Sequence, residues 1–167
     1  KGHFHLIGMP GAVLLIAEGY ATAATLHEAT GLPVAVAWDA GNLAPVAAAM
    51  RFRHKQTKIL ICADDDAAAK CAECKERVWL PDHPETCPSC SKPHRASNAG
   101  VTLASSAAVE VGGSWLRPTF PKEAARRDAF LRQGHKQSDF NDLHLAEGLH
   151  QVRVQVDARL TELGWRG

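Results

Sequence analysis

The sequence predicts an α/β fold, a mainly parallel sheet flanked by helices, and two observations lead to that prediction. Three short apolar runs rich in β-forming residues, at 13–17, 34–38 and 59–63, alternate with two stretches that favour helix, at 21–30 and 43–52. Strands that alternate with helices of about ten residues are typical of a doubly wound parallel sheet with right-handed crossovers. The third run is continuously apolar, as a strand buried on both faces would be, and it leads directly into three consecutive aspartates.

Turn-forming residues mark where the elements of the first half begin and end. Residues 1–11 contain glycines and a proline, so we expect an irregular segment there. The helix at 21–30 should end at Gly31, which can adopt the left-handed conformation of a C-terminal cap. Asn42 is placed to cap the next helix at its N-terminus.

The second half continues with helices and one further strand. A helix is expected from Asn98 to about residue 110, and a fourth strand at 115–118 should lie near an edge because Pro118 has no amide hydrogen. A capping sequence that begins at Ser138 predicts a short helix ending near Gly148. The stretch 149–163 has the apolar spacing of a helix, although alternating valines within it also fit a strand.

Composition limits the classes of function. The chain has 167 residues, of which 46% are hydrophobic, enough for one globular domain with a core. A formal net charge of +1 argues against a general electrostatic attraction to nucleic acid, so any such contact must come from local basic patches. No apolar run approaches membrane-spanning length and the start does not resemble a signal peptide, so we expect a cytoplasmic protein with no membrane partner. Because the chain opens without a methionine, we expect it to be a fragment of a longer protein.

Acidic residues follow several of the predicted strands. In open α/β sheets, sites form beyond the carboxyl ends of the strands, where these side chains would gather. Carboxylates of this kind select Mg²⁺ or Mn²⁺, ions that serve phosphate chemistry. The alternative is a solvated acidic turn, or a helix cap before Ala67. The acidic residues are Glu18, Asp39, Asp64, Asp65, Asp66, Asp139 and Asp142.

Two C-x-x-C pairs lie within a polar, proline-rich stretch at 70–96. Each pair can supply two thiolates from a tight turn, and two pairs complete the closed tetrahedral site of a structural Zn²⁺. We therefore predict a small zinc-ribbon-like insert; two disulfides or a redox pair are the alternatives, and His83 or His94 could replace one sulfur. The remaining Cys62 is expected to be a buried core residue. The predicted zinc ligands are Cys71, Cys74, Cys87 and Cys90.

An apolar strand that ends in Glu18-Gly19, followed by one that ends in Asp64-Asp65-Asp66, resembles the Toprim pattern. Topoisomerases, bacterial (DnaG-like) primases and certain nucleases share this pattern. Longer segments resemble the Toprim domains of plasmid- and phage-type primases and primase-helicases, and the likeness extends over 13–66 and about 98–148. It implies a Rossmann-like Toprim fold for residues 1–167, interrupted by the zinc-binding insert. The segments that carry it are 14–25, 40–43, 59–66 and 139–143.

The resemblance also implies roles for individual residues. Glu18 would be a metal ligand or a general acid/base, and Asp64 and Asp66 the metal-binding aspartate pair, so these three are the predicted catalytic residues. Asp65, between the pair, would be more exposed and less essential. The fourth ligand of Mg²⁺ or Mn²⁺ would be Asp139.

Two further points concern the same site. Asn141 or Asp142 would assist Asp139. Thr22 stands where many primases of this kind carry an aspartate, a departure that removes one potential ligand.

The function implied is primase chemistry, the metal-dependent joining of nucleotides into RNA primers on single-stranded DNA. Its partners would be the template, nucleotides and a helicase in the same chain or in the replisome. The isolated fragment is expected to make little primer, because the family also uses a basic lobe before the Toprim domain. The alternatives are a Toprim nuclease and a non-catalytic, zinc-bearing nucleic-acid-binding module; a topoisomerase is disfavoured because Tyr20 is the only tyrosine.

Basic and aromatic residues outside these motifs receive weaker predictions. The basic residues are expected to be solvated, with contact to the nucleic-acid backbone as the alternative. Trp38 is expected to pack in the interior, Trp79 to cover the zinc turns, and Tyr20 is a candidate to face the site. The candidate nucleic-acid contacts are Arg51, Arg53, Lys55, Arg126 and Arg127.

Overall fold

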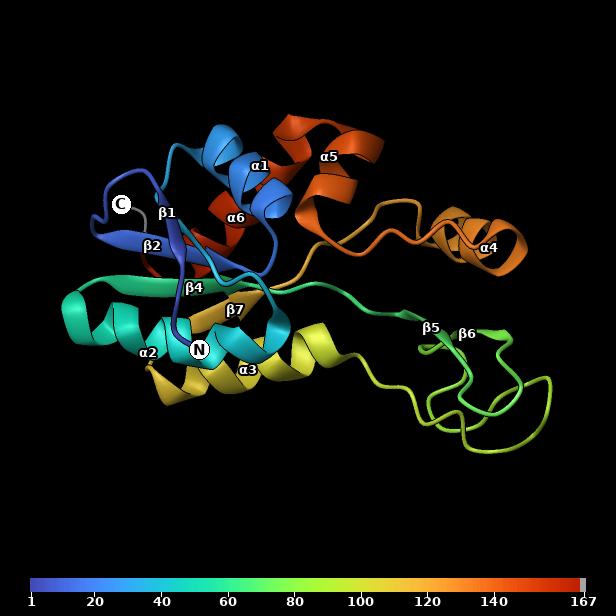
Figure 1. Ribbon diagram of the computed structural model, residues 1–167. Helices are drawn as coiled ribbons and strands as arrows, with labels where there is room; N and C mark the ends of the chain where they lie inside the picture. The colour runs from blue at the N-terminus through green and yellow to red at the C-terminus, as the bar shows by residue number, and fades with distance from the viewer. Residues whose placement is uncertain (166–167) are drawn as a thin grey trace.

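A computed structural model describes residues 1–165, and a five-stranded sheet forms its centre (Figure 1). The strand order is β1-β3-β2-β4-β7; neighbouring strands run parallel except for β1, which is antiparallel to β3. The predicted mainly parallel α/β fold is therefore confirmed. The strands are β1 (His5–Ile7), β2 (Val13–Ala17), β3 (Val34–Val36), β4 (Lys58–Cys62) and β7 (Ser114–Leu116).

Strand β1 was not expected, because residues 1–11 were predicted to be irregular. It pairs with β3 in the register His5↔Val36 and so covers one edge of the sheet. Three residues between glycines are too few to show a strand pattern in the sequence, and the pairing depends on the exposed edge of β3, which is distant in the chain.

Helices cover both faces of the sheet (Figure 1). Alternation along the strands explains this, because Leu15 points into one apolar cluster, with α1, α5 and α6, while Leu14 and Ile16 point into the other, with α2 and α3. The stretch at 149–163 is a helix and not a strand, since its Val152, Val156 and Leu160 pack into the first cluster. The helices are α1 (Tyr20–Thr30), the short η1 (Ala40–Asn42), α2 (Leu43–Arg53), α3 (Ala99–Glu110), α5 (Phe140–Glu147) and α6 (Leu149–Glu162).

A second, smaller lobe lies beside the sheet. The insert forms a hairpin of β5 (Ala68–Lys70) and β6 (Arg77–Trp79), followed by the cysteine turns. Helix α4 (Glu123–Gln133) lies against this hairpin and away from the sheet (Figure 1). The rings of Trp79 and Phe130 lie 6.4 Å apart, and the Arg77 guanidinium donates to the Leu131 carbonyl at 3.0 Å. We call residues 68–96 together with α4 the insert lobe.

None of the helices within residues 1–165 combines the length and apolar character that crossing a bilayer requires.

Candidate functional site

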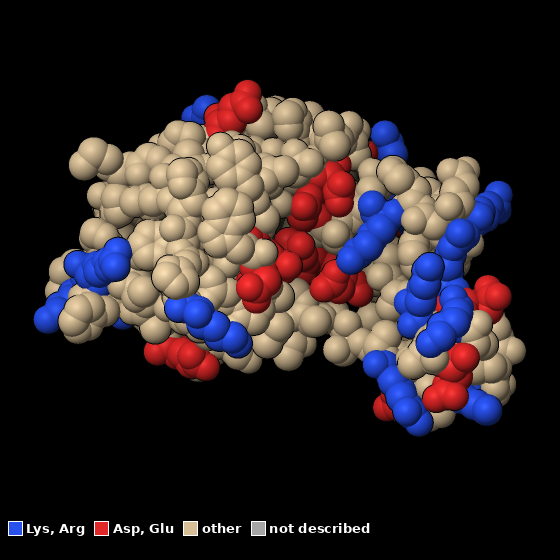
Figure 2. Space-filling model, viewed as in Figure 1, with Lys and Arg blue, Asp and Glu red and all other residues tan. Residues whose placement is uncertain are grey.

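Acidic residues lie along one edge of the sheet. Because β2, β3 and β4 are parallel, their carboxyl ends meet at this edge, and Ala17 of β2 stands level with Cys62 of β4. Figure 2 shows acidic side chains gathered between the sheet body and the insert lobe. We call this set the acidic rim: Glu18, Asp39, Asp64, Asp66 and Asp139.

The rim carboxylates act on one another electrostatically. Burial and the carboxylates of Glu18, Asp139 and Asp66 raise the pKa of Asp64 to about 7, and Lys136 offsets part of this effect. The pKa of Glu18 is also raised, first by burial and then by Asp66 and Asp39. Like charges that raise one another's pKa favour a bound cation, which would relieve their repulsion.

One buried carboxylate oxygen of the rim lacks a hydrogen-bond partner. The Oδ1 atom of Asp64 is buried and has no hydrogen-bond partner. By contrast, Asp66 accepts from Lys136 Nζ at 2.7 Å and from the backbone N–H of Gly100 at 3.1 Å. A buried acceptor without a donor is costly, and a hard cation satisfies it. The donor set therefore fits Mg²⁺ or Mn²⁺.

The rim is less tightly gathered than the cysteine set. Over residues 1–165, the four cysteines form the only group of three or more candidate ligand atoms that lie within 4.8 Å of one another. The rim carboxylates would have to turn toward a shared ion.

Asp139 is fixed at the start of α5. Its Oδ1 accepts from the backbone N–H of Asp142 at 2.7 Å in a reciprocal capping box, and its Oδ2 accepts from the Thr22 hydroxyl at 2.7 Å. Thr22, which stands at the position of an aspartate in the primase pattern that the chain resembles, thus orients the predicted ligand Asp139. Asn141 accepts from the Thr25 hydroxyl at 3.0 Å, and Asp142 accepts from the Ser138 amide at 2.7 Å.

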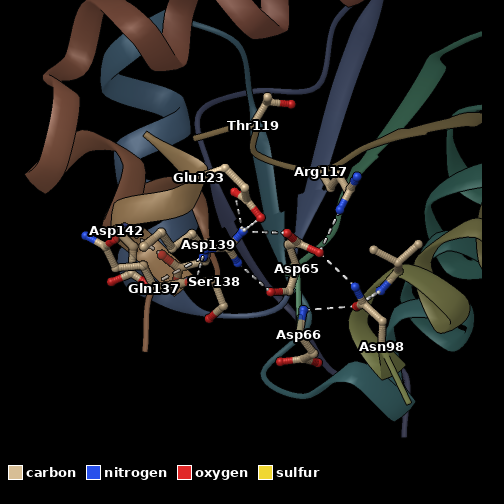
Figure 3. Close-up of polar contacts among 12 residues, drawn as sticks. Asp65, Asp66, Asn98, Arg117, Thr119, Glu123, Gln137, Ser138, Asp139 and Asp142 are labelled. Carbon is tan, nitrogen blue, oxygen red and sulfur yellow. Dashed lines mark hydrogen bonds and ion pairs between the residues drawn. The ribbon is translucent and has the colours of Figure 1, made fainter. Parts of the chain in front are cut away.

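Asp65 is the most deeply buried of the three aspartates, so the prediction that it would be more exposed is wrong. Figure 3 shows Arg117 and Asn98 pointing toward its carboxylate. Its carboxylate is 2% exposed and accepts from Arg126 at 2.8 Å, from Arg117 at 2.9 Å and from Asn98 at 2.7 Å. Burial alone would raise the pKa of Asp65, but the hydrogen bonds from Arg126 and Asn98 outweigh it and hold that pKa below its usual value. Asp65 turns away from its neighbours to anchor the strand end.

Arg126 is buried as well, which contradicts its prediction as a nucleic-acid contact. Its guanidinium lies against the rings of Phe120, at 4.3 Å, and Trp79, at 5.0 Å, and donates to the Asp65 backbone carbonyl and to that of Gln137. In the sequence Arg126 stands among charged residues that look solvated. Only the tertiary placement of α4 shows that it points inward.

Asn98 has a second role that the sequence did not reveal. It caps α3 as predicted, accepting from Val101 N–H, and it also accepts from Asp66 N–H at 2.9 Å. With its donation to Asp65, it fixes the backbone of the aspartate segment.

The other basic candidates differ in how far their side chains are occupied. The Arg51 guanidinium donates to the carbonyls of Val111, Lys55 and Thr57, so it joins α2 to its surroundings. Arg127 pairs with Asp82 and Asp128 on the surface. Arg53 and Lys55 are exposed. Nucleic-acid contact by these residues stays a prediction.

The four cysteines come together as the spacing predicted. All five cysteines of the chain are free thiols, and the sulfurs lie 3.6 Å apart in Cys74 and Cys87 and 3.9 Å apart in Cys71 and Cys90. The backbone N–H groups of Cys74 and Glu73 lower the pKa of Cys71, and those of Cys90 and Ser89 lower the pKa of Cys87 to about 7 against the effect of burial. Against the effect of the Glu76 backbone N–H, burial and the neighbouring sulfurs raise the pKa of Cys74 to about 12. Donors that stabilise thiolates suit a closed zinc site.

His94 and Trp79 have other roles than those predicted. Both ring nitrogens of His94 are engaged, Nε2 with the His83 carbonyl at 3.0 Å and Nδ1 with the Ala96 amide at 3.0 Å, so His94 orders the insert and is not a ligand. Trp79 packs with Ala67 and Phe130 on the α4 side. Val78 and Leu80 pack against the cysteines instead.

Comparison with known proteins agrees with this geometry. A family model described as a Toprim domain matches residues 13–150. Two relatives from Escherichia coli, both named DNA primase TraC, are 33% identical over 174 residues and 29% identical over 205 residues, alignments that include 97% and 98% of the chain. The chain spans only 14% of the length of each. No solved structure matches the chain significantly.

Proposed function

The chain belongs to the Toprim domain family, and from that premise we propose that it is the metal-binding catalytic domain of a DNA primase. In this proposal it joins nucleotides into RNA primers on a single-stranded DNA template. The primase names of the relatives support the primase assignment. The chain spans 14% of the length of those proteins. We propose that priming also uses segments outside residues 1–167 and that a helicase acts in the same chain or as a separate partner.

The observation that carries the proposal is the unpaired Oδ1 of Asp64 within the rim. This oxygen is buried, and its carboxyl group lies close enough to Glu18, Asp66 and Asp139 for all three to raise its pKa. Holding these like charges together lowers the stability of the protein, which is expected of a site that acts on a charged substrate.

In the proposed mechanism, Glu18, Asp64, Asp66 and Asp139 would hold Mg²⁺ or Mn²⁺, and the ion would neutralise charge on the reacting phosphates. Alternatively, Glu18 would accept the proton of the attacking 3′-hydroxyl at its carboxylate instead of holding the metal. Thr22 and the start of α5 fix the orientation of Asp139. Most of the rate then comes from positioning and charge, since the chain contributes no covalent step.

The insert has a structural role in this proposal. Cys71, Cys74, Cys87 and Cys90 hold one Zn²⁺ with no open position. The apolar residues beside them are too few to form an independent core, so the metal would replace that core.

Metal binding tests the proposal. Titration of Mn²⁺ into the zinc-loaded chain, followed by calorimetry, should show a site that Asp64→Asn weakens by more than tenfold. Asp82→Asn is the matched control, because Asp82 is an exposed aspartate of the insert lobe that pairs with Arg127. Equal Mn²⁺ affinity in Asp64→Asn and the unmutated chain would refute the rim as a metal site.

Activity separates the primase from its alternatives. A longer protein that contains this domain should incorporate ribonucleotides on single-stranded DNA, and Asp64→Asn should abolish incorporation. Metal-dependent cutting of DNA without nucleotides would instead indicate a Toprim nuclease. DNA binding that is unaffected by the rim substitutions, with neither activity, would indicate a non-catalytic module.

A further inference from the structure

Exposed aromatic side chains stand beside the acidic rim. Tyr20 is 53% exposed and Trp38 is 56% exposed, so Trp38 does not pack in the interior as predicted. Their rings are nearly parallel, at 10°, with centroids 6.5 Å apart. The exposed His5 ring lies 5.8 Å from that of Tyr20 and 6.5 Å from that of Trp38. We call these three side chains the aromatic platform.

The backbone holds Trp38 outward at a cost. Its φ is 74°, in the left-handed region that a bulky side chain rarely adopts and that costs on the order of 1 kcal/mol or more. Its N–H donates to the Glu18 carbonyl at 2.8 Å. The buried Asn42 amide donates to the carbonyls of Ala37 and His3, at 2.6 and 2.9 Å, and so braces the loop. The surrounding structure therefore holds Trp38 in a strained conformation although its side chain stays more than half exposed.

The platform and the rim share one edge of the molecule. Tyr20 is the first residue of α1, two residues after Glu18. The Trp38 amide is hydrogen-bonded to the Glu18 carbonyl, and Trp38 directly precedes Asp39. A polynucleotide whose phosphates approach the rim would bring its bases to this neighbourhood.

We propose that His5, Tyr20 and Trp38 form a stacking surface for the bases of single-stranded DNA beside the metal rim. The proposal rests on the proposed function, since the rim supplies the reason for nucleic acid to be there. Aromatic faces stack on any base, so an open aromatic surface suits a template of any sequence. In duplex DNA the base faces are already stacked on one another, so a single strand is the occupant.

Two other occupants fit the surface less well. A free nucleotide is normally held in a concave pocket that covers most of it, whereas both large rings here are more than half exposed. A protein partner normally buries about 800 Å² on each side. Three rings, each contributing at most about 150–250 Å² and already partly buried, do not reach that area.

Fluorescence anisotropy of a labelled oligothymidylate of about 20 nucleotides tests the proposal, with the zinc-loaded chain at low salt and no Mg²⁺ or Mn²⁺ added. Trp38→Asn keeps a residue that tolerates the left-handed backbone, so it should fold. Trp38→Asn and Tyr20→Ala should each weaken oligonucleotide binding about tenfold. Trp38→Tyr, which keeps an aromatic ring, should retain most of the affinity. Phe52→Ala is the matched control, since Phe52 is an aromatic residue 81% exposed on α2.

The remaining outcomes are decisive as well. Absence of binding by the unmutated chain, equal binding by the platform variants, or equal affinity for duplex DNA would overturn the proposal. Competition by free nucleoside triphosphate would assign the surface to the incoming nucleotide and also overturn it. Trp38→Asn should bind Mn²⁺ in the calorimetric titration as tightly as the unmutated chain does, so failure of the stacking surface and failure of the metal site are distinguished.

Discussion

Replacement of Arg126 by methionine should destabilise the protein strongly. The change removes the guanidinium but keeps an apolar side chain between Phe120 and Trp79. The buried Asp65 carboxylate then loses its Oδ2 partner, while Arg117 and Asn98 still donate to Oδ1. It is therefore a one-sided break in a buried ion pair.

The magnitude follows from the groups left without partners. Besides the carboxylate oxygen, the backbone carbonyls of Asp65 and Gln137 lose donors at 3.0 and 2.8 Å. Breaking one side of a buried ion pair costs about 3–5 kcal/mol, because the remaining charge stays desolvated. With Arg117 still in place, about 3 kcal/mol is the expected loss in the free energy of unfolding.

Urea unfolding of the zinc-loaded chain, followed by circular dichroism, measures this loss. Arg127→Met is the matched control, because it removes the neighbouring arginine of the same helix, whose pairs with Asp82 and Asp128 are on the surface. Its unfolding midpoint should stay near that of the unmutated chain. Adding Asp65→Asn to Arg126→Met should recover part of the loss, because the second change removes the unpaired charge.

The pH dependence gives an independent check. The pKa of Asp65 is lower in the folded protein than in the unfolded chain, so its contribution to stability is present above the unfolded pKa of about 3.9 and is lost as pH falls through the folded pKa. Arg126→Met should reduce the part of the acid-induced loss that arises from Asp65. If Arg126→Met costs no more than Arg127→Met, or leaves the acid limb unchanged, the interpretation of Arg126 as a buried anchor is refuted.

Three further predictions concern the two metal sites. Cys90→Ser, or removal of zinc with a chelator, should unfold the insert, which limited proteolysis would show as new cleavage within 70–96; persistent resistance would argue against a structural zinc. Gly100→Ala should destabilise the chain by about 1–3 kcal/mol and weaken Mn²⁺ binding, because the added Cβ would lie 2.4 Å from the Asp64 carbonyl oxygen. Gly11→Ala is the control, because a Cβ added at Gly11 would have no other atom within 4 Å. Both variants would be measured by urea unfolding, and an equal loss of stability in the two would contradict the steric argument. The metal-free pKa of Asp64 is about 7, so protons compete with Mn²⁺ and its affinity should fall by up to about tenfold per unit as pH drops below 7. Calorimetry at several pH values should show that slope in the unmutated chain and a weaker one in Asp64→Asn.

Local patterns were sufficient to predict most of the fold. Continuous apolar runs predicted the buried β2 and β4, and their alternation with helical stretches predicted the parallel sheet. The paired C-x-x-C spacing predicted that the cysteines would meet, because each pair forms a local turn and two such turns commonly bind one tetrahedral Zn²⁺. These features depend on neighbours in the sequence or on the general rules of sheet topology.

What the sequence did not reveal depends on partners that are distant along the chain. Asp65 looks like an exposed residue between two ligands, and Arg126 looks like one of several surface arginines 61 residues later. Their burial follows from the packing of α4 against the insert and not against the sheet. Likewise Trp38 reads as the apolar end of a strand, whereas β3 ends at Val36 and the left-handed backbone at Trp38 turns the ring outward.

The same contacts connect the zinc site to the rim. The cysteine turns pack under Val78, and the adjacent Trp79 lies against Arg126, which binds both the carboxylate and the backbone carbonyl of Asp65. Asp65 is covalently joined to Asp64 and Asp66, so a displacement of its backbone displaces both proposed ligands. An insert at this point of the fold is therefore more than a tolerated loop. Loss of zinc should loosen Trp79 and, through Arg126, the aspartate segment, and weaker Mn²⁺ binding by the zinc-free chain would be its measurable consequence.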